Sequence, residues 1–415
     1  MKQNTAALQI LFLTDNFPPE GNAPATRTME HAVRWVRMGC HVTVITGAPN
    51  FPEGRVFAGY KNTWYQREEI EGIQVVRVKT YITANEGFLR RILDYLSFML
   101  TSFFAGLIQK RPDVIVATSP QLFTVCSGWL LSVCRRRPFV FELRDLWPAS
   151  IIAVGAMKKG RVIRLLERLE LFLYRRASAI VSVTHAFKKD LVERGIEAAK
   201  ISVIINGVDL TCYQPAASKD PVLSAQYGLD HKFVIGYIGT HGLAHGLGVI
   251  LDAAERLQAS PDIVFMLVGS GAAKQDLVDQ ANVRGLTNVL FVDRQPKEMM
   301  AKYWSMCDVS FIHLKNAPLF TTVIPSKLFE AMGMGLPVIM ALPEGEATAL
   351  VREHACGRVI PPEAGECLAD TVLALQSDQP QLQAYQQAAL KAALLFSREI
   401  KAKEMLGVLR QVAQK

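Results

Sequence analysis

Short apolar runs, alternating with glycine-containing loops and helical stretches, constrain the fold of this chain more than any other feature. The first series is an apolar run at residues 8–14, a loop rich in proline and glycine, a helical stretch at 26–38 and a second apolar run at 41–46. A strand, a helix and a strand in this order predict a βαβ unit, and such units build parallel sheets.

The same alternation continues through both halves of the chain. Further strands are predicted at residues 75–78, 114–117, 139–143, 179–183, 201–205, 233–238, 263–268, 289–292, 309–312 and 337–340. We therefore predict an α/β protein of two doubly wound, Rossmann-like domains that face a cleft, with the boundary near residues 206–215. Open α/β sheets bind ligands beyond the carboxyl ends of their strands, so the cleft is the expected site.

Composition agrees with a globular protein of a reducing compartment. The chain has 415 residues, of which 50% are hydrophobic, enough for two or three domains and too apolar for a disordered chain. Its seven cysteines include no C-x-x-C pair, and the short apolar run near the N-terminus does not resemble a secretory signal. A cytoplasmic location is expected.

Charge is divided unequally between the two halves. Residues 1–200 carry 28 Lys and Arg against 17 Asp and Glu, whereas residues 201–415 carry 18 against 21. The first half is therefore expected to meet an anionic partner, either a nucleic acid or a membrane surface. Residues 88–108 form an amphipathic stretch with a narrow polar stripe, which predicts either a buried core helix or a helix in the membrane interface.

Basic clusters at residues 135–137, 158–161 and 175–176 favour the membrane. We therefore expect residues 86–111 and these clusters to contact the anionic inner membrane surface. A nucleic-acid partner is not expected, because no aromatic-interleaved basic groove or helix-turn-helix pattern accompanies the charge. The sequence also lacks a D-x-D motif and histidines at metal-ligand spacing, so no metal or cofactor is expected.

Two glycine loops follow predicted strands in the second half and precede helical stretches. They are Gly239-Thr240-His241-Gly242 and Gly269-Ser270-Gly271. Glycine lets a backbone approach a phosphate closely, and a helix N-terminus supplies N–H donors. Each loop is therefore either a phosphate cradle or a simple strand-to-helix turn.

Residues 325–337 combine a helix start with two charged side chains. Ser326 is a suitable N-cap, and Lys327 and Glu330 lie three residues apart on one helical face. One interpretation is a nucleotide-sugar site in which Lys327 binds the diphosphate and Glu330 the ribose hydroxyls. The other is an ordinary surface pair with a capping role.

A second charged group follows the predicted strand at 139–143. Glu142, Arg144 and Asp145 stand at its carboxyl end, where charges are costly unless they are paired or functional. A functional site and a structural Arg–Asp pair are the two interpretations.

Together these residues resemble a retaining nucleotide-sugar glycosyltransferase of the GT-B fold, in the family numbered four. The resemblance runs from the loop at residues 15–21 through 142–148, 203–209 and 238–246 to 325–337. It is greatest to the branch that makes bacterial O-antigen and capsule, typified by the N-acetyl-L-fucosamine transferases. It implies a nucleotide-sugar donor, UDP-linked first and GDP-linked second, and a polyprenyl-diphosphate-linked acceptor at the inner membrane face. The transferred sugar would be an N-acetylated deoxyhexosamine.

The resemblance also assigns roles to single residues. Glu330 matches the second glutamate of the family's E-x7-E motif, whereas Thr322 stands where the first glutamate is usual. The usual Arg and Lys of the diphosphate clamp are absent, since His241 and His245 stand near their places. We hypothesise that Lys327, Arg294, His241 and backbone N–H groups of residues 239–242 replace that clamp. The full donor-binding set is Gly239, Thr240, His241, Gly269, Gly271, Arg294, Thr322, Ser326, Lys327 and Glu330.

The acceptor is expected in the first domain. Asp145 is predicted to orient the acceptor or the sugar, Arg144 to bind the acceptor diphosphate, and Gly21 and Asn22 to line the acceptor site. Asp145, Lys327 and Glu330 form the predicted catalytic set. The domains are predicted at 1–205 and 206–383, with a C-terminal helix at about 384–415 returning to the first. Two rivals remain: a nucleotide-sugar 2-epimerase or hydrolase of the same fold, and a non-catalytic pseudo-transferase that scaffolds polysaccharide assembly at the membrane.

Overall fold

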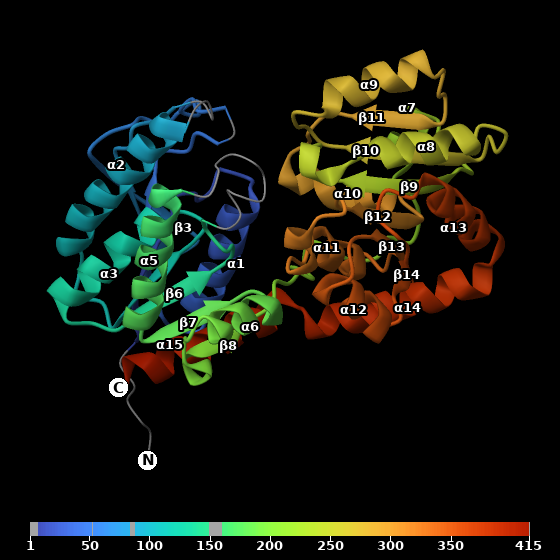
Figure 1. Cartoon of the computed structure of the whole chain (residues 1–415). Coiled ribbons are helices and arrows are strands. Elements are labelled where there is room, and N and C mark those ends of the chain that lie inside the picture. The colour runs from blue at the N-terminus through green and yellow to red at the C-terminus, as the bar shows by residue number, and fades with distance from the viewer. Residues whose placement is uncertain (1–6, 52, 84–87, 149–159, 415) are drawn as a thin grey trace. The chain divides into compact units, whose positions relative to one another are not determined.

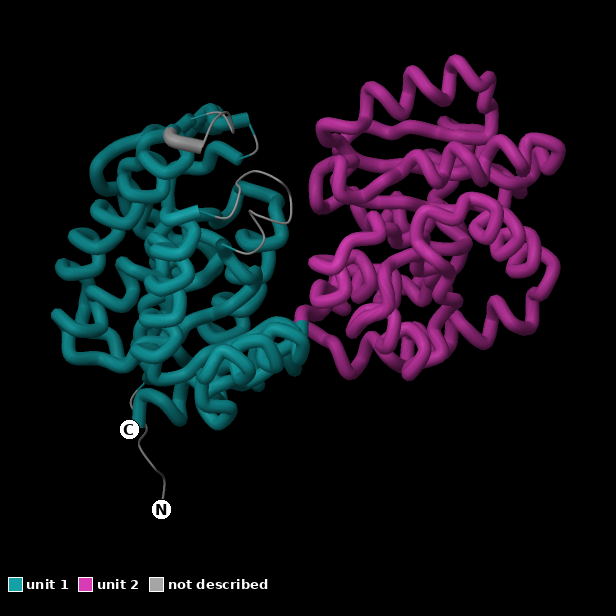
Figure 2. The backbone as a smooth tube through the Cα atoms, viewed as in Figure 1, with its two compact units in different colours: residues 1–205, 399–415 teal, residues 206–398 magenta. Residues whose placement is uncertain are grey.

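The computed structural model describes residues 7–51, 53–83, 88–148 and 160–414. The chain divides into two compact units (Figure 2). Unit 1 comprises Met1–Ile205 and Glu399–Lys415, and unit 2 comprises Asn206–Arg398.

The described part of unit 1 is built on an eight-stranded sheet with the order β3-β4-β2-β1-β5-β6-β7-β8. Its strands are β1 (Gln9–Leu13), β2 (His41–Gly47), β3 (Tyr65–Ile70), β4 (Ile73–Val78), β5 (Val114–Thr118), β6 (Phe139–Leu143), β7 (Ala179–Ser182) and β8 (Ile201–Val203). Strand β3 pairs antiparallel with β4, and the other neighbours are parallel. Every residue of β5 and β6 is buried, as expected for central strands covered on both faces.

Helices cover both faces of this sheet (Figure 1). They are α1 (Ala23–Arg37), α2 (Phe88–Leu107), α3 (Leu122–Arg135), α5 (Arg161–Arg176), α6 (His185–Glu193) and α15 (Arg398–Ala413), with the 3-10 turn η1 (Ala198–Lys200). One core cluster joins the sheet to α1 and α15, and α3 packs between α2 and α5. Asn22 accepts a hydrogen bond from the Ala25 N–H and Pro24 follows, so α1 begins three residues earlier than predicted.

The described part of unit 2 contains a six-stranded parallel sheet with the order β11-β10-β9-β12-β13-β14. Its strands are β9 (Phe233–Ile238), β10 (Ile263–Val268), β11 (Val289–Val292), β12 (Val309–His313), β13 (Val338–Ala341) and β14 (Gly357–Val359). Its α-helices are α7 (Pro221–Tyr227), α8 (Gly248–Arg256), α9 (Lys274–Val283), α10 (Met300–Ser305), α11 (Lys327–Gly333), α12 (Glu346–Glu353), α13 (Gly365–Ser377) and α14 (Gln379–Leu395). Three 3-10 turns complete it: η2 (Leu243–His245), η3 (Lys297–Met299) and η4 (Pro318–Thr321).

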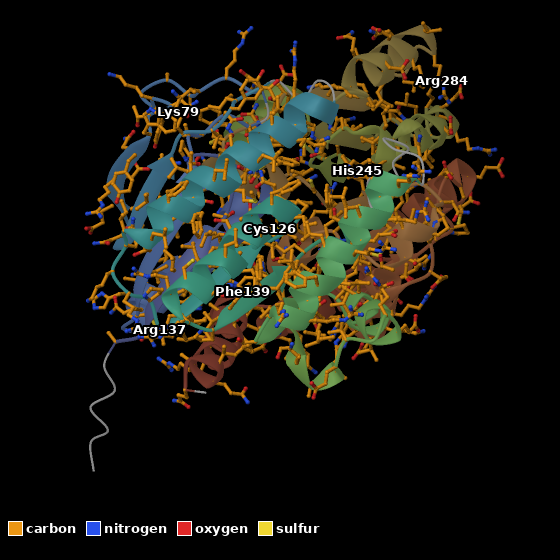
Figure 3. The ribbon with its side chains drawn as sticks, turned by 60° about the vertical axis from the view of Figure 1, so that its left-hand side comes forward. Lys79, Cys126, Arg137, Phe139, His245 and Arg284 are labelled. Carbon is orange, nitrogen blue, oxygen red and sulfur yellow. The ribbon has the colours of Figure 1, made fainter. Side chains whose placement is uncertain are left out.

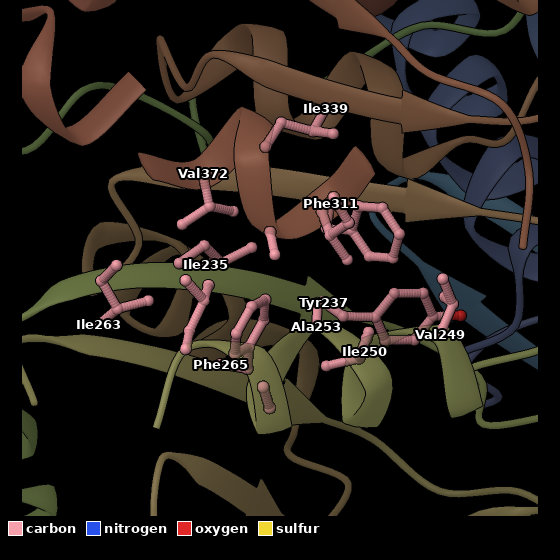
Figure 4. Close-up of a cluster of buried hydrophobic side chains, with 14 of the residues drawn as sticks. Ile235, Tyr237, Val249, Ile250, Ala253, Ile263, Phe265, Phe311, Ile339 and Val372 are labelled. Carbon is pink, nitrogen blue, oxygen red and sulfur yellow. The ribbon is translucent and has the colours of Figure 1, made fainter. Parts of the chain in front are cut away.

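The core of unit 2 lies between the sheet and the helices α8, α9 and α13. Side chains such as Ile235, Phe265 and Phe311 alternate along their strands and meet Ile250 and Val372 from the helices (Figure 4). The sheet order reverses at β9, which lies between β10 and β12. Connections leave a doubly wound sheet in opposite directions at such a point, and ligands bind there.

The C-terminal region differs from the prediction of one returning helix at 384–415. Helix α14 ends at Leu395 and packs on α11 and α13 of unit 2, and only α15 joins unit 1. A bridge between Val208 and Ser397 interrupts the helical pattern. Within unit 1, the Trp35 indole N–H donates to Ala402 O at 2.9 Å, and Arg34 pairs with Glu399 at 3.2 Å.

Candidate functional site

The two glycine loops of unit 2 pack backbone against backbone beyond β9 and β10. A Cβ atom at Gly269 would clash with Gly239 O, and one at Gly271 would clash with the His241 backbone. The Gly239 N–H donates to Val268 O and the His241 N–H to Ser270 O, both at 2.9 Å. These glycines therefore hold two loops together. The predicted cradle is wrong for the N–H groups of Gly239 and His241, because both are already bonded.

Lys327 is the most unusual side chain at this edge of the sheet. It is 9% exposed, and its Nζ has no hydrogen-bond partner among the described residues. The ammonium lies 3.6 Å from the centroid of the Tyr237 ring, a cation–π contact, and a Cβ at Gly239 would lie 2.9 Å from Nζ. Burial lowers the pKa of Lys327 to about 7, although Glu330 opposes that shift. The interpretation as an ordinary surface pair is therefore wrong for Lys327.

Two histidines place further unpartnered nitrogens beside Lys327. Neither ring nitrogen of His241 has a hydrogen-bond partner in the described structure, and the same holds for Nδ1 of His245. Burial lowers the pKa of His241 to about 4, with Lys274 and Lys327 adding to the effect. Burial and Lys327 likewise lower the pKa of His245 to about 4. We call Lys327, His241 and His245 the nitrogen cluster.

His313 at the end of β12 fixes the loop that carries the cluster. Its Nε2 accepts a hydrogen bond from the Glu363 N–H at 2.9 Å, so the ring proton lies on Nδ1, which donates to His245 O at 2.5 Å. His313 and Tyr237 were not predicted from the sequence as site residues. Their positions at the ends of β12 and β9, where the strand order of the sheet reverses, are the signal from which they could have been found.

The remaining predicted donor residues occupy less distinctive positions. The Trp304 indole N–H donates to Glu330 Oε2 at 3.3 Å, which orients a half-buried carboxylate. Thr322 bonds back to Leu319 O at 2.9 Å, and Thr240 is exposed. Ser326 occupies the N-cap position of α11 without a side-chain capping bond, so its predicted capping role is wrong.

Arg294 lies exposed beyond β11, and no contact in the described structure brings it to Lys327. Its neighbour Asp293 pairs with Lys274 at 2.6 Å, and Lys274 also donates to Gly269 O and Val292 O. Lys274 therefore ties the loops after β10 and β11 together. With Lys327, it is one of two cations near His241, and it was not predicted from the sequence.

In unit 1, the predicted acceptor residues lie in loops that follow β1 and β6. Asn22 caps α1 and donates from Nδ2 to Asn16 Oδ1, while Gly21 is exposed. The N–H groups of Arg144 and Asp145 donate to Ser119 Oγ at 2.8 and 3.3 Å. Ser119 follows β5, so hydrogen bonds join the ends of β5 and β6 at this edge.

Glu142 serves a structural purpose. It pairs with Arg27 of α1 at 2.9 Å, and both side chains are 1% exposed. Burial alone would raise the pKa of Glu142, but Arg27 and Arg144 outweigh it and the pKa is lowered. This buried Arg27–Glu142 pair joins α1 to β6, and the Arg27 guanidinium also donates to Ile204 O.

Unit 1 also contains a pocket of about 380 Å³ that was not predicted from the sequence. It lies beyond β1 and β5, and three α2 residues, Arg91, Asp94 and Tyr95, form one wall. The other lining residues are in loops, except Pro24 of α1 and Thr118 of β5: Thr14, Asp15, Asn16, Glu20, Asn22, Pro24, Asn50, Phe51, Gly54, Thr83, Thr118, Ser119, Pro120 and Gln121. We call it the unit 1 pocket.

Helix α2 presents its apolar side to solvent. Leu93, Leu100 and Phe104 are 53%, 53% and 63% exposed, and Ile108, directly after the helix, is 65% exposed. Ser97 and Asp94 turn toward the protein instead: Ser97 Oγ accepts from the Tyr81 N–H at 2.7 Å, and Asp94 lines the pocket. Together with the exposed Val133 of α3 and Val162 and Leu165 of α5, these side chains make up what we call the apolar face of unit 1. Figure 3 shows the three helices side by side, with Cys126 marking α3. A core helix would hide such residues.

The expected membrane residues have mixed roles. Arg135 donates to Leu107 O at 2.8 Å and Gln109 O at 2.7 Å, so it satisfies carbonyls at the end of α2. Arg136, Arg175 and Arg176 are exposed, whereas residues 86, 87, 158 and 159 lie outside the described residues. Among the described helices, none combines the length and apolar character that crossing a bilayer requires. Nor do three or more His, Cys, Asp or Glu side chains gather as a metal site in the described chain.

Both halves of the chain match glycosyltransferase families. The family of the glycosyl transferase 4-like domain matches residues 22–207, and the family of glycosyl transferases group 1 matches residues 232–378. The first match lies almost wholly in unit 1 and the second in unit 2.

Individual relatives agree with these matches. The chain is 29% identical over 336 residues to Escherichia coli (strain K12) WcaI, named for glycosyl transfer in colanic acid biosynthesis, covering 79% of this chain and 82% of WcaI. It is 27% identical over 202 residues to Bacillus subtilis (strain 168) TuaH, named for teichuronic acid biosynthesis, covering 48% and 49%. Anabaena HepE, crystallised with UDP and glucose, has a TM-score of 0.70 at 21% identity, covering 97% and 99%. This likeness confirms the predicted fold of two Rossmann-like domains.

Proposed function

Because glycosyltransferase families match both of its units, the chain belongs to the glycosyltransferases of the GT-B fold, and we propose that it uses a nucleoside-diphosphate sugar to extend a polyprenyl-diphosphate-linked saccharide. The reaction we propose belongs to surface polysaccharide synthesis at the inner membrane face. It retains anomeric configuration, needs no metal and transfers an N-acetylated deoxyhexosamine.

The observation that carries the donor half of this proposal is the nitrogen cluster. An unpaired ammonium is costly to bury, and buried polar groups are ordinarily hydrogen-bonded. A diphosphate beside Lys327 would supply the missing negative charge and the missing hydrogen-bond acceptors. The neutral rings of His241 and His245 each carry one N–H to donate as well.

The chemistry of transfer explains why charge is placed there. As the bond to the anomeric carbon breaks, negative charge builds on the departing diphosphate, and preorganised donors and cations stabilise it. We assign this role to Lys327 and His241, with Glu330 binding the ribose hydroxyls. Arg294, whose long side chain is exposed beyond β11, would contribute as well. Asp145 and Arg144 are assigned to the acceptor.

The donor nucleotide and the pathway rest on relatives. HepE was crystallised with UDP, which supports a UDP-linked donor here. WcaI and TuaH carry names from polysaccharide biosynthesis, which supports an acceptor of that class.

The apolar face of unit 1 supports attachment to the membrane. Exposed leucine and phenylalanine side chains, together with exposed arginines of the same unit, suit the boundary between lipid chains and anionic headgroups. A lipid-linked acceptor would be held at the same boundary.

Thermal stabilisation of the protein by UDP, GDP and ADP, with and without EDTA, tests the donor assignment. Ligand at ~100 Kd adds about 2.7 kcal/mol to the free energy of unfolding, so the melting temperature rises visibly. We expect UDP to stabilise the protein with EDTA present, and Lys327→Met to abolish that effect. The matched control is Lys302→Met, because Lys302 is exposed. Absence of stabilisation by any nucleotide would favour the pseudo-transferase instead.

A further inference from the structure

His245, a member of the nitrogen cluster, lies on a turn that is too short to fix its own position. The turn η2 has three residues, and the His245 N–H donates back to Gly242 O at 3.0 Å. The His245 ring lies against Tyr237, with ring centroids 6.1 Å apart, and its Nδ1 has no partner among the described residues. The contacts that hold this ring near Lys327 must therefore come from another part of unit 2.

The end of β12 supplies those contacts through two successive carbonyl groups of η2. The Nδ1–H of His313 donates to His245 O at 2.5 Å, and the Lys315 N–H donates to Ala244 O at 3.0 Å. The His313 side chain is 1% exposed, so water has little access to its bond with His245. The backbone of η2 is therefore fixed on the residues that leave β12.

Gly246 shows how closely η2 fits against this end of β12. Its φ of +51° is left-handed, and a Cβ there would lie 2.9 Å from Lys315 Cγ and 3.1 Å from His313 Cε1. Glycine permits both the left-handed backbone and the close approach. The fit therefore depends on the shape of η2 as well as on the His313 ring.

The other nitrogen of His313 binds a second loop. Nε2 accepts from the Glu363 N–H at 2.9 Å, and Glu363 Oε2 accepts from the Asn316 N–H at 3.2 Å. A neutral imidazole has one acceptor and one donor nitrogen, so both polar atoms of His313 are used. His313 thus joins the loop after β9 to the loop after β14.

Given the proposed function, we propose that His313 is a positioning residue for nucleoside diphosphate binding: its Nδ1–H holds the His245 carbonyl and thereby keeps the His245 ring in place beside Lys327. His313 acts through His245 and does not contact the nucleotide. Groups that bind a diphosphate must be held in place before it arrives, because a displacement of about 1 Å costs much of their effect.

Two substitutions separate the two hydrogen bonds of His313. In His313→Asn, the side-chain Nδ2 takes roughly the place of the imidazole Nδ1 and can still donate to His245 O. In His313→Gln, the longer side chain brings Oε1 toward the place of Nε2, where it can accept from the Glu363 N–H. Each variant loses one hydrogen bond, so we expect similar losses of stability. Only His313→Gln should release His245.

Titration calorimetry of the full chain with UDP measures the consequence. We expect His313→Asn to bind UDP within about 3-fold of the wild type, and His313→Gln and His313→Phe to bind it about 10-fold more weakly. Uridine lacks the diphosphate, so its binding, followed by saturation-transfer difference NMR, should be alike in all four proteins. Melting temperatures check that each variant folds. The matched control is His231→Asn, at an exposed position before β9, which should bind UDP like the wild type.

Three results would overturn the positioning role and leave the nucleotide site standing. They are UDP affinity unchanged in both His313→Gln and His313→Phe, equal losses of UDP affinity in His313→Asn and His313→Gln, and a loss of uridine affinity as large as the loss of UDP affinity. The second and third would show that His313 serves the fold of unit 2. A wild type that binds no UDP would contradict the proposed donor site, and the positioning role with it.

Discussion

The two units share one architecture and place opposite chemistry at the same edge of their sheets. In unit 2, the loop after β9 carries His241 and His245, and α11 begins at Lys327. Both ring nitrogens of His241, Nδ1 of His245 and Nζ of Lys327 have no bonding partners among the described residues. In unit 1, the strand ends carry Asp15, and α2 brings Asp94 to it. Nitrogen-bearing side chains therefore gather at this edge in one unit, and carboxyl groups gather there in the other.

The charge at each of these sites is opposite to the net charge of the half of the sequence that contains it. The first half has the excess of Lys and Arg, yet its pocket is acidic, and the more acidic second half contains the nitrogen cluster. Net charge reports mostly on exposed side chains, such as Arg136 and Arg176 of unit 1. The buried groups at the strand ends, and not the net charge, indicate which kind of ligand each unit binds.

The largest effect on stability is expected from replacing Glu142, a buried carboxylate of unit 1 that forms an ion pair. Glu142→Gln leaves Arg27 buried without its counter-charge, so we expect the free energy of unfolding to fall by about 3–5 kcal/mol. Urea denaturation measures this loss. Glu193→Gln, at an exposed pair with Lys189, is the control and should change stability by less than about 0.5 kcal/mol. A loss as small as the control's would contradict the structural role.

Lys327→Met should give the next largest effect, on activity. Removing one preorganised charge from the departing diphosphate is expected to lower turnover about 10²- to 10³-fold. The same change should raise the melting temperature, because the variant no longer buries an unpaired ammonium. Steady-state kinetics and calorimetry measure the two effects. A variant that loses stability together with activity would indicate that Lys327 serves the fold.

Asp94→Asn tests how much stability a partly buried charge costs in unit 1, as Lys327→Met does in unit 2. The folded protein holds the pKa of Asp94 at about 6, above the ordinary 3.8, so the wild type loses stability as the pH rises through this range. Above pH 7 we expect the variant to be more stable by about 1–2 kcal/mol, allowing for the partial exposure of the side chain. Near pH 4 the difference should vanish. A gain independent of pH would contradict the assigned titration.

The smallest single effects are expected at the apolar face. Phe104→Ser and Ile108→Ser should each weaken binding to vesicles that contain anionic phosphatidylglycerol by about 1 kcal/mol, since each removes part of a buried side chain from lipid. Vesicle sedimentation measures this binding. Leu394→Ser and Leu395→Ser, at exposed positions on α14 of unit 2, are the controls. Equal losses in both pairs would show that exposed apolar side chains bind vesicles without regard to position.

Much of the fold could be predicted because buried parallel strands read as continuous apolar runs. The runs that became β5, β6, β9 and β10 were found within a residue. Strand β3 was missed, because its sequence Tyr65–Ile70 is polar and alternates between half-buried and exposed positions at the sheet edge. The two C-terminal helices were merged, because the break at Phe396 and Ser397 carries neither glycine nor proline.

Less of the site could be predicted, because tertiary contacts create it. Lys327 was identified from its motif, whereas its burial against Tyr237 depends on residues ninety positions earlier in the chain. Asp15 and Asp94 each look like ordinary surface carboxylates in the sequence. Only the packing of α2 against α3, β2 and β4 brings them together.

Calorimetric titration of UDP into wild type and Lys327→Met at pH 8, in buffers of different ionisation enthalpy, tests the central claim most directly. Free Lys327, with a pKa of about 7, is mostly neutral at this pH, and a bound diphosphate would hold its proton. We predict that UDP binding to the wild type takes up nearly one proton and that Lys327→Met binds weakly with no uptake. Equal affinity and equal proton uptake in both proteins would contradict the nitrogen cluster as the donor site.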